Sequence, residues 1–233
     1  MSGVVVTDIQ RADAAVTAAL AEFGSATVHE AMGRIGYAGP RLRPIQQGAR
    51  IAGTAITVSV APGDNLMVHA AIEQAREGDV IVVVPISDSA FGFIGDLKAT
   101  QMKARGVRGY VTTGGVRDTQ ELREMGFPVW TRHVSAQGTV KDTAGSVNVP
   151  VILDDVEVRP GDIVVADDDG VTIVPRRRAE EALSASRARA AKETANRARY
   201  LSGEISMDLN GLRPVLDDLG VRYVTQEDHD GGR

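Results

Sequence analysis

One stretch, residues 95–121, does most to restrict the fold that this chain can adopt. It runs in the order glycine turn, helix, short apolar strand, second glycine turn and second helix start. Asp96 lies in the first turn, and Arg117 and Asp118 lie in the second, after an interval that holds one helix and one strand. Successive loops of a parallel α/β sheet meet at the same edge. The stretch therefore predicts a mixed α/β fold in which two carboxylates and a guanidinium share one crevice.

Hydrophobic periodicity and turn residues on either side of this stretch predict further elements of both kinds. Asp13 is a plausible N-cap for the first helix, and Ser25 or Thr27 for the second. The predicted helices are 13–23, 25–33, 66–75, 97–105, 119–125 and 177–202, and the predicted strands are 49–60, 79–84 and 108–112, with the extended segment 128–130, irregular β structure over 131–160, and a hairpin of 162–166 and 171–174 that turns at Asp169-Gly170.

The domain organisation follows from length and from the absence of a linker-like composition. The 233 residues are enough for one large domain, with the hydrophobic (43%) and charged (24%) content of an ordinary globular protein. No stretch has the composition of a domain boundary. We therefore predict one domain over residues 1–225 and a disordered polar tail over 226–233.

Composition also excludes several classes of function. The net charge is −5 with no long basic tract, which argues against nucleic-acid binding. The chain has no cysteine, which excludes disulfides, thiolate zinc sites and cysteine nucleophiles, and suits a reducing cytoplasm. The first ten residues lack the features of a signal peptide, and no apolar run approaches the length of a membrane span. We expect a cytoplasmic protein without a membrane partner.

Asp118 has two interpretations, which the residues alone leave open. With Glu121 it fits a capping box at the start of a helix. Alternatively, Gly114-Gly115 and a helix N-terminus form an anion site, where Arg117 can bind a carboxylate through two parallel hydrogen bonds. Asp118 would then hold a divalent cation beside that carboxylate. Magnesium fits the second interpretation, because it keeps several waters and needs only one or two protein carboxylates.

Other candidate residues also have a structural alternative. Asp96 either caps the following helix or orients a metal-bound water, and the triplet 167–169 indicates a hairpin turn more than a metal site. Lys98 fits a solvated surface lysine better than a Schiff-base lysine, since nothing near it in sequence predicts a lowered pKa. His29, one turn into a short helix, stands out among the four histidines. Gly114-Gly115 lacks the spacing of a nucleotide-binding loop.

The motif Asp96-x20-Arg117-Asp118 resembles that of the class II pyruvate aldolases that cleave 4-hydroxy-4-methyl-2-oxoglutarate and 4-carboxy-4-hydroxy-2-oxoadipate, which share a fold with the regulators of ribonuclease activity A. The resemblance covers nearly the whole chain and includes the segments ATVHEAMGRIG (26–36), RIAGTAITVSVAPGDNLMVHAAIE (50–73), GDLKAT (95–100), GGVRD (114–118), SAQGTVKDTAGSVNVPV (135–151) and RPGDIVVADDDGVTIVP (159–175). It implies a three-layer, swivelling β/β/α-type α/β domain with a long C-terminal helix, assembled as a homotrimer or hexamer.

The resemblance also implies a role for each matching residue. Asp118 would ligate Mg²⁺, Mn²⁺ or another divalent metal directly, while Asp96 and Glu193 of a neighbouring subunit would hold metal-bound water. Arg117 would bind the substrate and stabilise an enolate, and the backbone N–H groups of the turn from Gly95 through Leu97 and Lys98 would cradle the pyruvyl carboxylate. Asn65 and His29 match positions that line the pocket, and His29 is the second candidate for the base after the metal-associated water.

The implied reaction is retro-aldol cleavage of an oxo-acid substrate to pyruvate, with oxaloacetate decarboxylation as a secondary activity. The competing function is a non-catalytic protein that binds and inhibits a ribonuclease, but the chain keeps the catalytic motif. Two positions depart from the family: Lys98 replaces a residue that is usually apolar, and Thr113 replaces a common aspartate. A lysine beside the pocket offers a partner for an extra substrate carboxylate.

Overall fold

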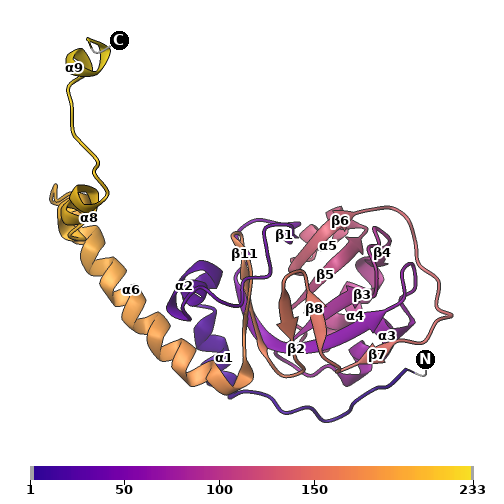
Figure 1. Ribbon diagram of the computed structural model, residues 1–233. Coiled ribbons are helices and arrows are strands. Elements are labelled where there is room, and N and C mark those ends of the chain that lie inside the picture. The colour runs from indigo at the N-terminus through magenta and orange to yellow at the C-terminus, as the bar shows by residue number, and fades with distance from the viewer. Residues whose placement is uncertain (1–2, 232–233) are drawn as a thin grey trace. The chain divides into compact units, whose positions relative to one another are not determined.

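Continuous apolar runs form the central strands of a nine-stranded sheet in the computed structural model, which describes residues 3–231 (Figure 1). The strands of this sheet are β1 (Arg43–Pro44), β2 (Ile51–Val60), β3 (Asp79–Pro85), β4 (Gly92–Ile94), β5 (Gly109–Val116), β6 (Val129–Val134), β7 (Ser146–Val147), β10 (Ile163–Asp167) and β11 (Gly170–Val174). A separate hairpin consists of β8 (Val151–Leu153) and β9 (Val156–Val158).

The helices of the chain lie between these strands and after them. They are α1 (Ala14–Leu20), α2 (Gly24–Ala31), α3 (Leu66–Gln74), α4 (Asp96–Ala104), α5 (Thr119–Glu124), the 3₁₀ turn η1 (Arg176–Arg178), α6 (Ala179–Leu201), α7 (Ser206–Leu209), α8 (Arg213–Asp218) and α9 (Gln226–Asp230). Within the described residues, no helix is both long enough and apolar enough to cross a membrane.

The sheet combines a parallel centre with antiparallel edges. Its order is β1-β6-β5-β3-β2-β10-β11, with β4 also paired to β5 and β7 to β2. The pairs β2–β3, β3–β5 and β5–β6 are parallel, whereas β10 is antiparallel to both β2 and β11. Parallel neighbours need crossover connections, and α3, α4 and α5 lie in these connections. The turns that follow the parallel strands therefore collect at one edge, as the sequence predicts.

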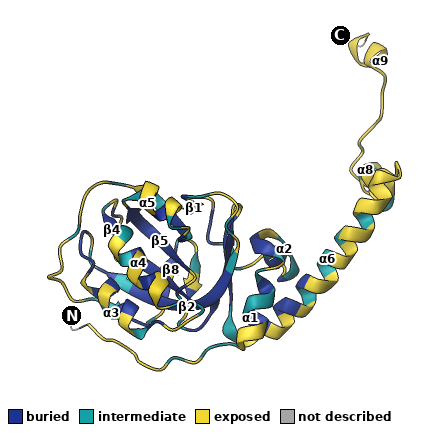
Figure 2. Cartoon of the chain, turned by 180° about the vertical axis from the view of Figure 1, so that it is seen from behind, coloured by how far each residue is buried: buried dark blue, intermediate teal, exposed yellow. Residues whose placement is uncertain are grey.

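Three layers enclose two main cores. Met102 of α4 and Leu122 of α5 pack with α3 against one face of the sheet, in a cluster that includes Ile81. On the other face, the β8–β9 hairpin packs Leu153 against Trp130 and its neighbours. In Figure 2 the central strand β5 is buried along its whole length and β3 along almost all of it, while α3, α4 and α5 each keep an exposed side. The predicted three-layer α/β fold is confirmed.

Most predicted elements form, but several of the details differ. Asp13 caps α1 as predicted, because its carboxylate accepts hydrogen bonds from the N–H groups of Ala15 and Val16. The caps predicted for the second helix are wrong: Phe23 occupies the N-cap position without a side-chain bond, and the Ser25 hydroxyl donates to Asp167 instead. In the 162–174 hairpin, Asp167 pairs with residue 170, so the turn lies one residue earlier than predicted.

Contacts divide the chain within α6 into two units, residues 1–189 and residues 190–233. The first unit contains the sheet and its three cores, the third of which joins α1, α2 and the start of α6 to β10 and β11. The second unit is helical and contains α9, where the sequence predicts a disordered tail; residues 232–233 of that tail lie outside the described residues. The prediction of a single domain over 1–225 stays a prediction.

Candidate functional site

The central strand β5 positions Arg117 and Asp118, which directly follow its last residue. The N–H of Arg117 bonds to the carbonyl of Ile94 at 3.0 Å, which ties the end of β5 to β4. The predicted glycine turn at 113–116 is wrong, because these residues continue the buried strand past a bulge in its pairing with β6. A Cβ at position 114 would lie 2.5 Å from the Phe93 ring, so its glycine serves close packing and not anion binding.

Asp118 stands at the N-cap position of α5, but its side chain does not cap the helix. Its backbone is left-handed (φ 54°, ψ 42°), and its carboxylate makes no bond to the helix N–H groups. Oδ2 instead accepts the N–H of Asp96 at 3.2 Å and lies 3.5 Å from Arg117 Nε. The capping-box interpretation is therefore wrong. The two turns meet through this carboxylate, as the predicted shared crevice requires.

Gly95 allows the Asp118 carboxylate to approach the first turn. A Cβ on Gly95 would lie 1.9 Å from Asp118 Oδ2, although the glycine backbone is extended and not left-handed. Helix α4 begins at Asp96, so Gly95 and not Asp96 takes the N-cap position. Leu97 and Lys98 lie in the first turn of α4, where N–H groups have no acceptor inside the helix.

Asn65 connects the start of α3 to the strand that leads into this turn. It is 2% exposed, and its Nδ2 donates to the carbonyl of Phe93 at 2.8 Å. Its Oδ1 is also buried but has no hydrogen-bond partner within the described residues. An unpaired buried acceptor is uncommon in a folded protein and calls for a ligand or a water. Asn65 thus bonds to β4 two residues before Gly95, and its predicted role in lining the pocket stays a prediction.

A loop that the sequence did not implicate, residues 135–143, reaches the same region. The N–H of Gly92 bonds to the carbonyl of Gln137 at 2.8 Å, and a Cβ on Gly138 would lie 3.3 Å from Arg117 Nη1. The loop reaches the start of α3 as well, where the N–H of Asn65 bonds to the carbonyl of Val140 at 3.0 Å. Isolated backbone contacts hold this loop, and they leave no periodic signal in the sequence.

Lys98 differs from the solvated surface lysine that the sequence predicts. Its side chain is half-buried, and burial lowers the pKa of its ammonium, to which the positive charges of Lys141 and Arg117 add. The pKa of His69 on α3 is lowered in the same way, by burial first and then by Lys98 and Lys141. Several cationic groups therefore border the paired turns.

His29 lies on α2, away from these contacts. Its Nδ1 is 3.1 Å from the carbonyl of Ile35, and its ring centroid is 5.7 Å from that of Tyr37. His29 lines a cavity of about 250 Å³ with residues of α2, β11 and the β10–β11 turn, and neither Asp96 nor Asp118 lines it. Within one chain, no contact among the described residues joins His29 to the paired turns.

Two further candidates need separate treatment. Glu193 lies on α6 in the second unit, so its predicted role in the metal site stays a prediction. The triplet 167–169 is structural, as the sequence favours: the Asp167 carboxylate accepts the N–H groups of Ser25 and Asp169, and the Asp168 carboxylate accepts the N–H of Gly48.

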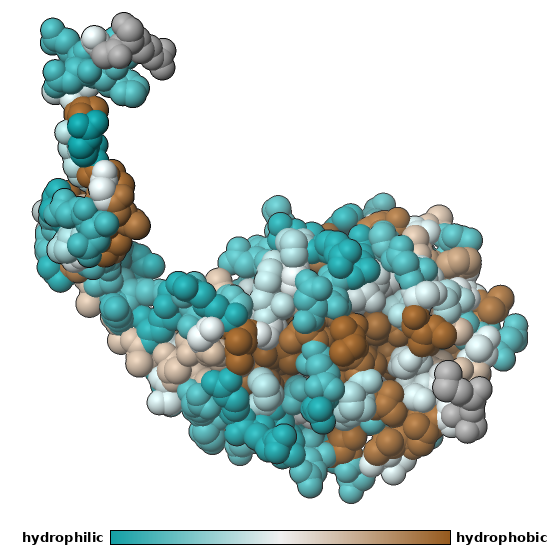
Figure 3. Space-filling model, viewed as in Figure 1, coloured by the Kyte–Doolittle hydropathy of each residue, from teal (hydrophilic) through white to brown (hydrophobic). Residues whose placement is uncertain are grey.

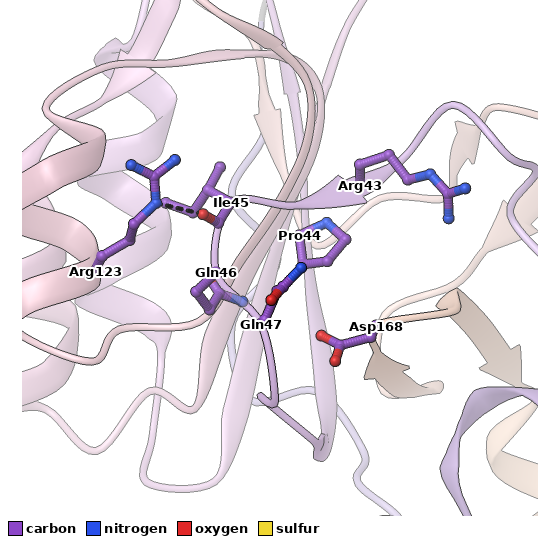
Figure 4. A pocket seen from close by; sticks show the side chains of 7 residues that line it. All are labelled: Arg43, Pro44, Ile45, Gln46, Gln47, Arg123 and Asp168. Carbon is purple, nitrogen blue, oxygen red and sulfur yellow. Dashed lines mark hydrogen bonds between the residues drawn. The ribbon is translucent and has the colours of Figure 1, made fainter.

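A larger cavity of about 620 Å³ lies elsewhere, beside β1 (Figure 4). Its lining side chains are Arg43, Pro44, Ile45, Gln46, Gln47, Arg123 and Asp168. Arg123 turns to the carbonyl of Ile45, and Asp168 is bonded to the backbone of Gly48. This cavity contains none of the predicted site residues, and its charged groups already bond within the protein.

The donor chemistry at the paired turns suits a hard divalent cation. Within residues 3–231, the Asp96 carboxylate and Asp118 Oδ1 accept no hydrogen bond, and the Asp118 side chain is 32% exposed. No group of three or more His, Cys, Asp or Glu side chains in this range is arranged to hold a metal. A cation held by one carboxylate and several waters needs no such group, and magnesium is bound in this way.

The chain is similar to proteins of known families along most of its length. The model of the RraA-like family, described as Aldolase/RraA, matches residues 25–173. A protein of Halalkalibacterium halodurans, provisionally named 4-hydroxy-4-methyl-2-oxoglutarate aldolase, is 34% identical over 164 residues, which are 70% of this chain and 78% of the relative. A Thermus thermophilus protein with the name 4-hydroxy-4-methyl-2-oxoglutarate aldolase is 33% identical over 54% of this chain and 77% of its own length.

A solved structure shares the fold. Streptomyces coelicolor RraAS2, described as an unusual member of the RNase ES inhibitor RraA protein family, superposes with a TM-score of 0.74 and 29% identity. The match covers 82% of this chain and 99% of that one. Aldolases and a ribonuclease-inhibitor family are thus both represented among the similar proteins.

Proposed function

The chain belongs to the RraA-like family of aldolases and RraA proteins, and we propose that it is a divalent-metal-dependent aldolase. Its substrate would be a 4-hydroxy-2-oxo di- or tricarboxylate, such as 4-carboxy-4-hydroxy-2-oxoadipate or 4-hydroxy-4-methyl-2-oxoglutarate, which it cleaves to pyruvate and a second oxo acid. The main support is the Asp118 carboxylate, which is turned away from its helix and toward the N–H of Asp96. A carboxylate that only capped the helix would instead accept N–H groups of the first turn of that helix.

The residues of the two turns have complementary roles in the proposed reaction. Cleavage between C3 and C4 leaves an electron pair on the pyruvyl fragment as an enolate. The guanidinium of Arg117 lies beside Asp118 and stabilises this charge where it develops. The free N–H groups at the first turn of α4 hold the pyruvyl carboxylate, as helix N-termini hold anions. Asp118 would hold Mg²⁺, Mn²⁺ or another divalent cation, which would supply Lewis-acid stabilisation of the developing negative charge.

A base must remove the proton of the C4 hydroxyl, and the enolate must then take up a proton at C3 to become pyruvate. Asp96 accepts no hydrogen bond from the described residues, so its carboxylate is available to orient a water that takes this proton. We propose that Glu193 of a second copy of the chain holds the same water, and that His29 is the next candidate. The same enolate chemistry predicts decarboxylation of oxaloacetate.

An intersubunit site requires assembly, which we propose is a homotrimer or hexamer in the cytoplasm. Apolar side chains are exposed on the first unit, including Ile86 (72%) and Leu97 (79%). Figure 3 shows a band of apolar residues across the visible face of this unit. Exposed apolar patches of this kind mark protein–protein contacts.

Pyruvate release from the two named substrates and from oxaloacetate tests this function. We expect turnover with Mg²⁺, loss of turnover with EDTA, and no turnover by Asp118→Ala. The inhibitor family of the S. coelicolor structure provides the alternative, a protein that binds a ribonuclease without chemistry. Absence of metal-dependent turnover, together with inhibition of a ribonuclease E-type enzyme, would favour that alternative.

A further inference from the structure

Beside the paired turns lies a group of basic side chains that the proposed reaction does not use. Lys98 belongs to the first turn of α4, His69 to α3, and Lys141 to the 135–143 loop. Within the part of the chain that the structure describes, neither lysine forms an ion pair or a hydrogen bond. Uncompensated lysines that gather around a half-buried position indicate an anion that is bound from outside.

Backbone contacts fix the position of Lys141 between the two parts of the site. The residue before it, Val140, exchanges hydrogen bonds with Gly63 and Asn65, at 2.9 and 3.0 Å. The residue after it, Asp142, donates its N–H to Asp64 Oδ2 at 2.6 Å. The Lys141 backbone is therefore held at the N-terminus of α3, where His69 lies one turn after Asn65.

Lys98 belongs to the other part of the site, the first turn of α4. It is two residues after Asp96, in a turn that Asp118 holds through the Asp96 N–H. Asn65 links the two parts, because its Nδ2 bonds to Phe93, two residues before Gly95. Its buried Oδ1 has no partner within residues 3–231 and does not cap the helix. This acceptor calls for a hydrogen-bond donor, such as a water or the C4 hydroxyl of the substrate, and so marks this region as one that a ligand enters.

The mutual effects of these groups agree with this placement. The charges of Lys141 and Arg117 both lower the pKa of Lys98, and those of Lys98 and Lys141 both lower the pKa of His69. The backbone contacts carry the placement itself: Lys141 is held at the start of α3, and Asn65 joins α3 to the strand that leads to Lys98. Arg117 is assigned to the pyruvyl end of the substrate, so the lysines are left for another part of it.

We propose that Lys98 and Lys141, with His69 as a further donor, form a second anion site that binds the distal carboxylates of the substrate and selects tricarboxylates over dicarboxylates. This proposal rests on the proposed aldolase function. It deepens that function, because it assigns the choice between the two named substrates to side chains outside the reacting centre.

Paired kinetics test the second anion site. Values of kcat/KM are measured with 4-carboxy-4-hydroxy-2-oxoadipate and 4-hydroxy-4-methyl-2-oxoglutarate for wild type, Lys98→Leu, Lys98→Arg, Lys141→Met and the control Lys103→Leu. We expect the tricarboxylate-to-dicarboxylate ratio to fall about 10- to 100-fold in Lys98→Leu and Lys141→Met, the range for one lost charge-assisted hydrogen bond. Lys98→Arg should restore most of the ratio.

The control removes a lysine from the same helix. Lys103 donates to the carbonyl of Met125 at the far end of α4, and its removal should leave the ratio at the wild-type value. A ratio that stays within about twofold of wild type in both Lys98→Leu and Lys141→Met would overturn the proposal, since one charged contact is expected to exceed that change.

A binding measurement separates this proposal from the aldolase function. Calorimetry in EDTA compares propane-1,2,3-tricarboxylate with glutarate as probes, so that neither turnover nor a metal is involved. Wild type should bind the tricarboxylate more tightly, and Lys98→Leu should lose this difference. If wild type cleaves no 4-hydroxy-2-oxo acid, the aldolase function fails, and this measurement still decides the anion site. Equal affinity of wild type for both probes would overturn it.

Discussion

Asp64 and Asp118 both stand at the start of a helix in the candidate site, but their surroundings differ. Asp64 is 1% exposed, and its carboxylate accepts three backbone N–H groups, from Leu66, Asp142 and Thr143, at 2.6–2.8 Å. Asp118 is partly exposed and left-handed, and one backbone N–H reaches it at 3.2 Å. One carboxylate is saturated by the protein, whereas the other keeps acceptor capacity for something outside it.

This difference separates a carboxylate that stabilises the fold from one that is available for chemistry. Burial alone would raise the pKa of Asp64, but its N–H donors outweigh burial and lower that pKa. The N–H groups of Asp142 and Thr143 are among these donors, so Asp64 holds the 135–143 loop against the start of α3. Replacing each aspartate by asparagine should therefore reduce mainly stability at Asp64 and mainly activity at Asp118.

The largest effect is expected for Asp118→Asn. The variant keeps the shape of the side chain and a residue that tolerates the left-handed backbone, but it loses the charge that holds the cation. We expect kcat/KM to fall on the order of 10³-fold, with the unfolding free energy changed by less than about 0.5 kcal/mol. Steady-state kinetics and urea denaturation measure both quantities. A large loss of stability with normal activity would reverse the comparison.

Gly95→Ala should have the next largest effect on activity, since it keeps the Asp118 carboxylate but displaces it. The added Cβ would lie 1.9 Å from Asp118 Oδ2, so the carboxylate must shift. A displacement of about 1 Å at a reacting centre costs on the order of 10²-fold in rate. The extended backbone of Gly95 accepts alanine, so the melting temperature should change little. Wild-type kinetics in this variant would mean that the close approach of the two turns is not needed.

Asp64→Asn should act mainly on stability. Its amide would present N–H donors to backbone groups that need an acceptor, at a cost of about 2 kcal/mol in unfolding free energy. The loss should depend on pH with a defined sign. Because the folded pKa is lowered, the carboxylate stabilises the wild type above the unfolded value of about 4, and this contribution disappears as the pH falls through the folded pKa.

Urea denaturation of Asp64→Asn and wild type across this range measures the difference. The two curves should converge once the pH is below the lowered folded pKa, because the wild-type carboxyl is then protonated in both states. A difference that is constant between about pH 7 and about pH 3 would show that the charge of Asp64 contributes nothing.

The smallest effect is expected for the stability of Lys98→Leu. Burial and the charges of Lys141 and Arg117 penalise the folded ammonium, so its removal should stabilise the protein, by less than about 1 kcal/mol because solvent screens the group. The folded pKa is lowered, so this advantage exists at neutral pH and vanishes as the pH rises past the unfolded value of about 10.4. Thermal unfolding of wild type and Lys98→Leu at about pH 7 and about pH 10.5 measures how their difference in stability changes with pH.

The sequence was sufficient for the fold class and for the meeting of the two turns. Alternating and continuous apolar runs identify β2, β3 and α3 because local periodicity reports which face is buried. Asp96, Arg117 and Asp118 meet because parallel topology brings successive turns to one edge. Both inferences use short-range patterns and one general rule of topology.

The errors arose where long-range packing decides the local structure. Gly114-Gly115 resembles a turn, but pairing with β4 and β6 extends the strand through it, and Phe93 and Ala90 leave room there for glycine alone. Asp118 resembles a cap, but its left-handed backbone redirects the carboxylate. The role of Lys141 depends on a bridge between Asp64 and Val140 that no local pattern encodes.

The left-handed backbone at Asp118 has a consequence for how this chain can change over generations. Asparagine and glycine adopt that conformation readily, and a single nucleotide change in an aspartate codon yields either one. Both replacements remove the carboxylate and preserve the turn. A gene for this chain can therefore lose the proposed chemistry in one step while it keeps its fold, and the resulting protein is free to be selected for binding alone.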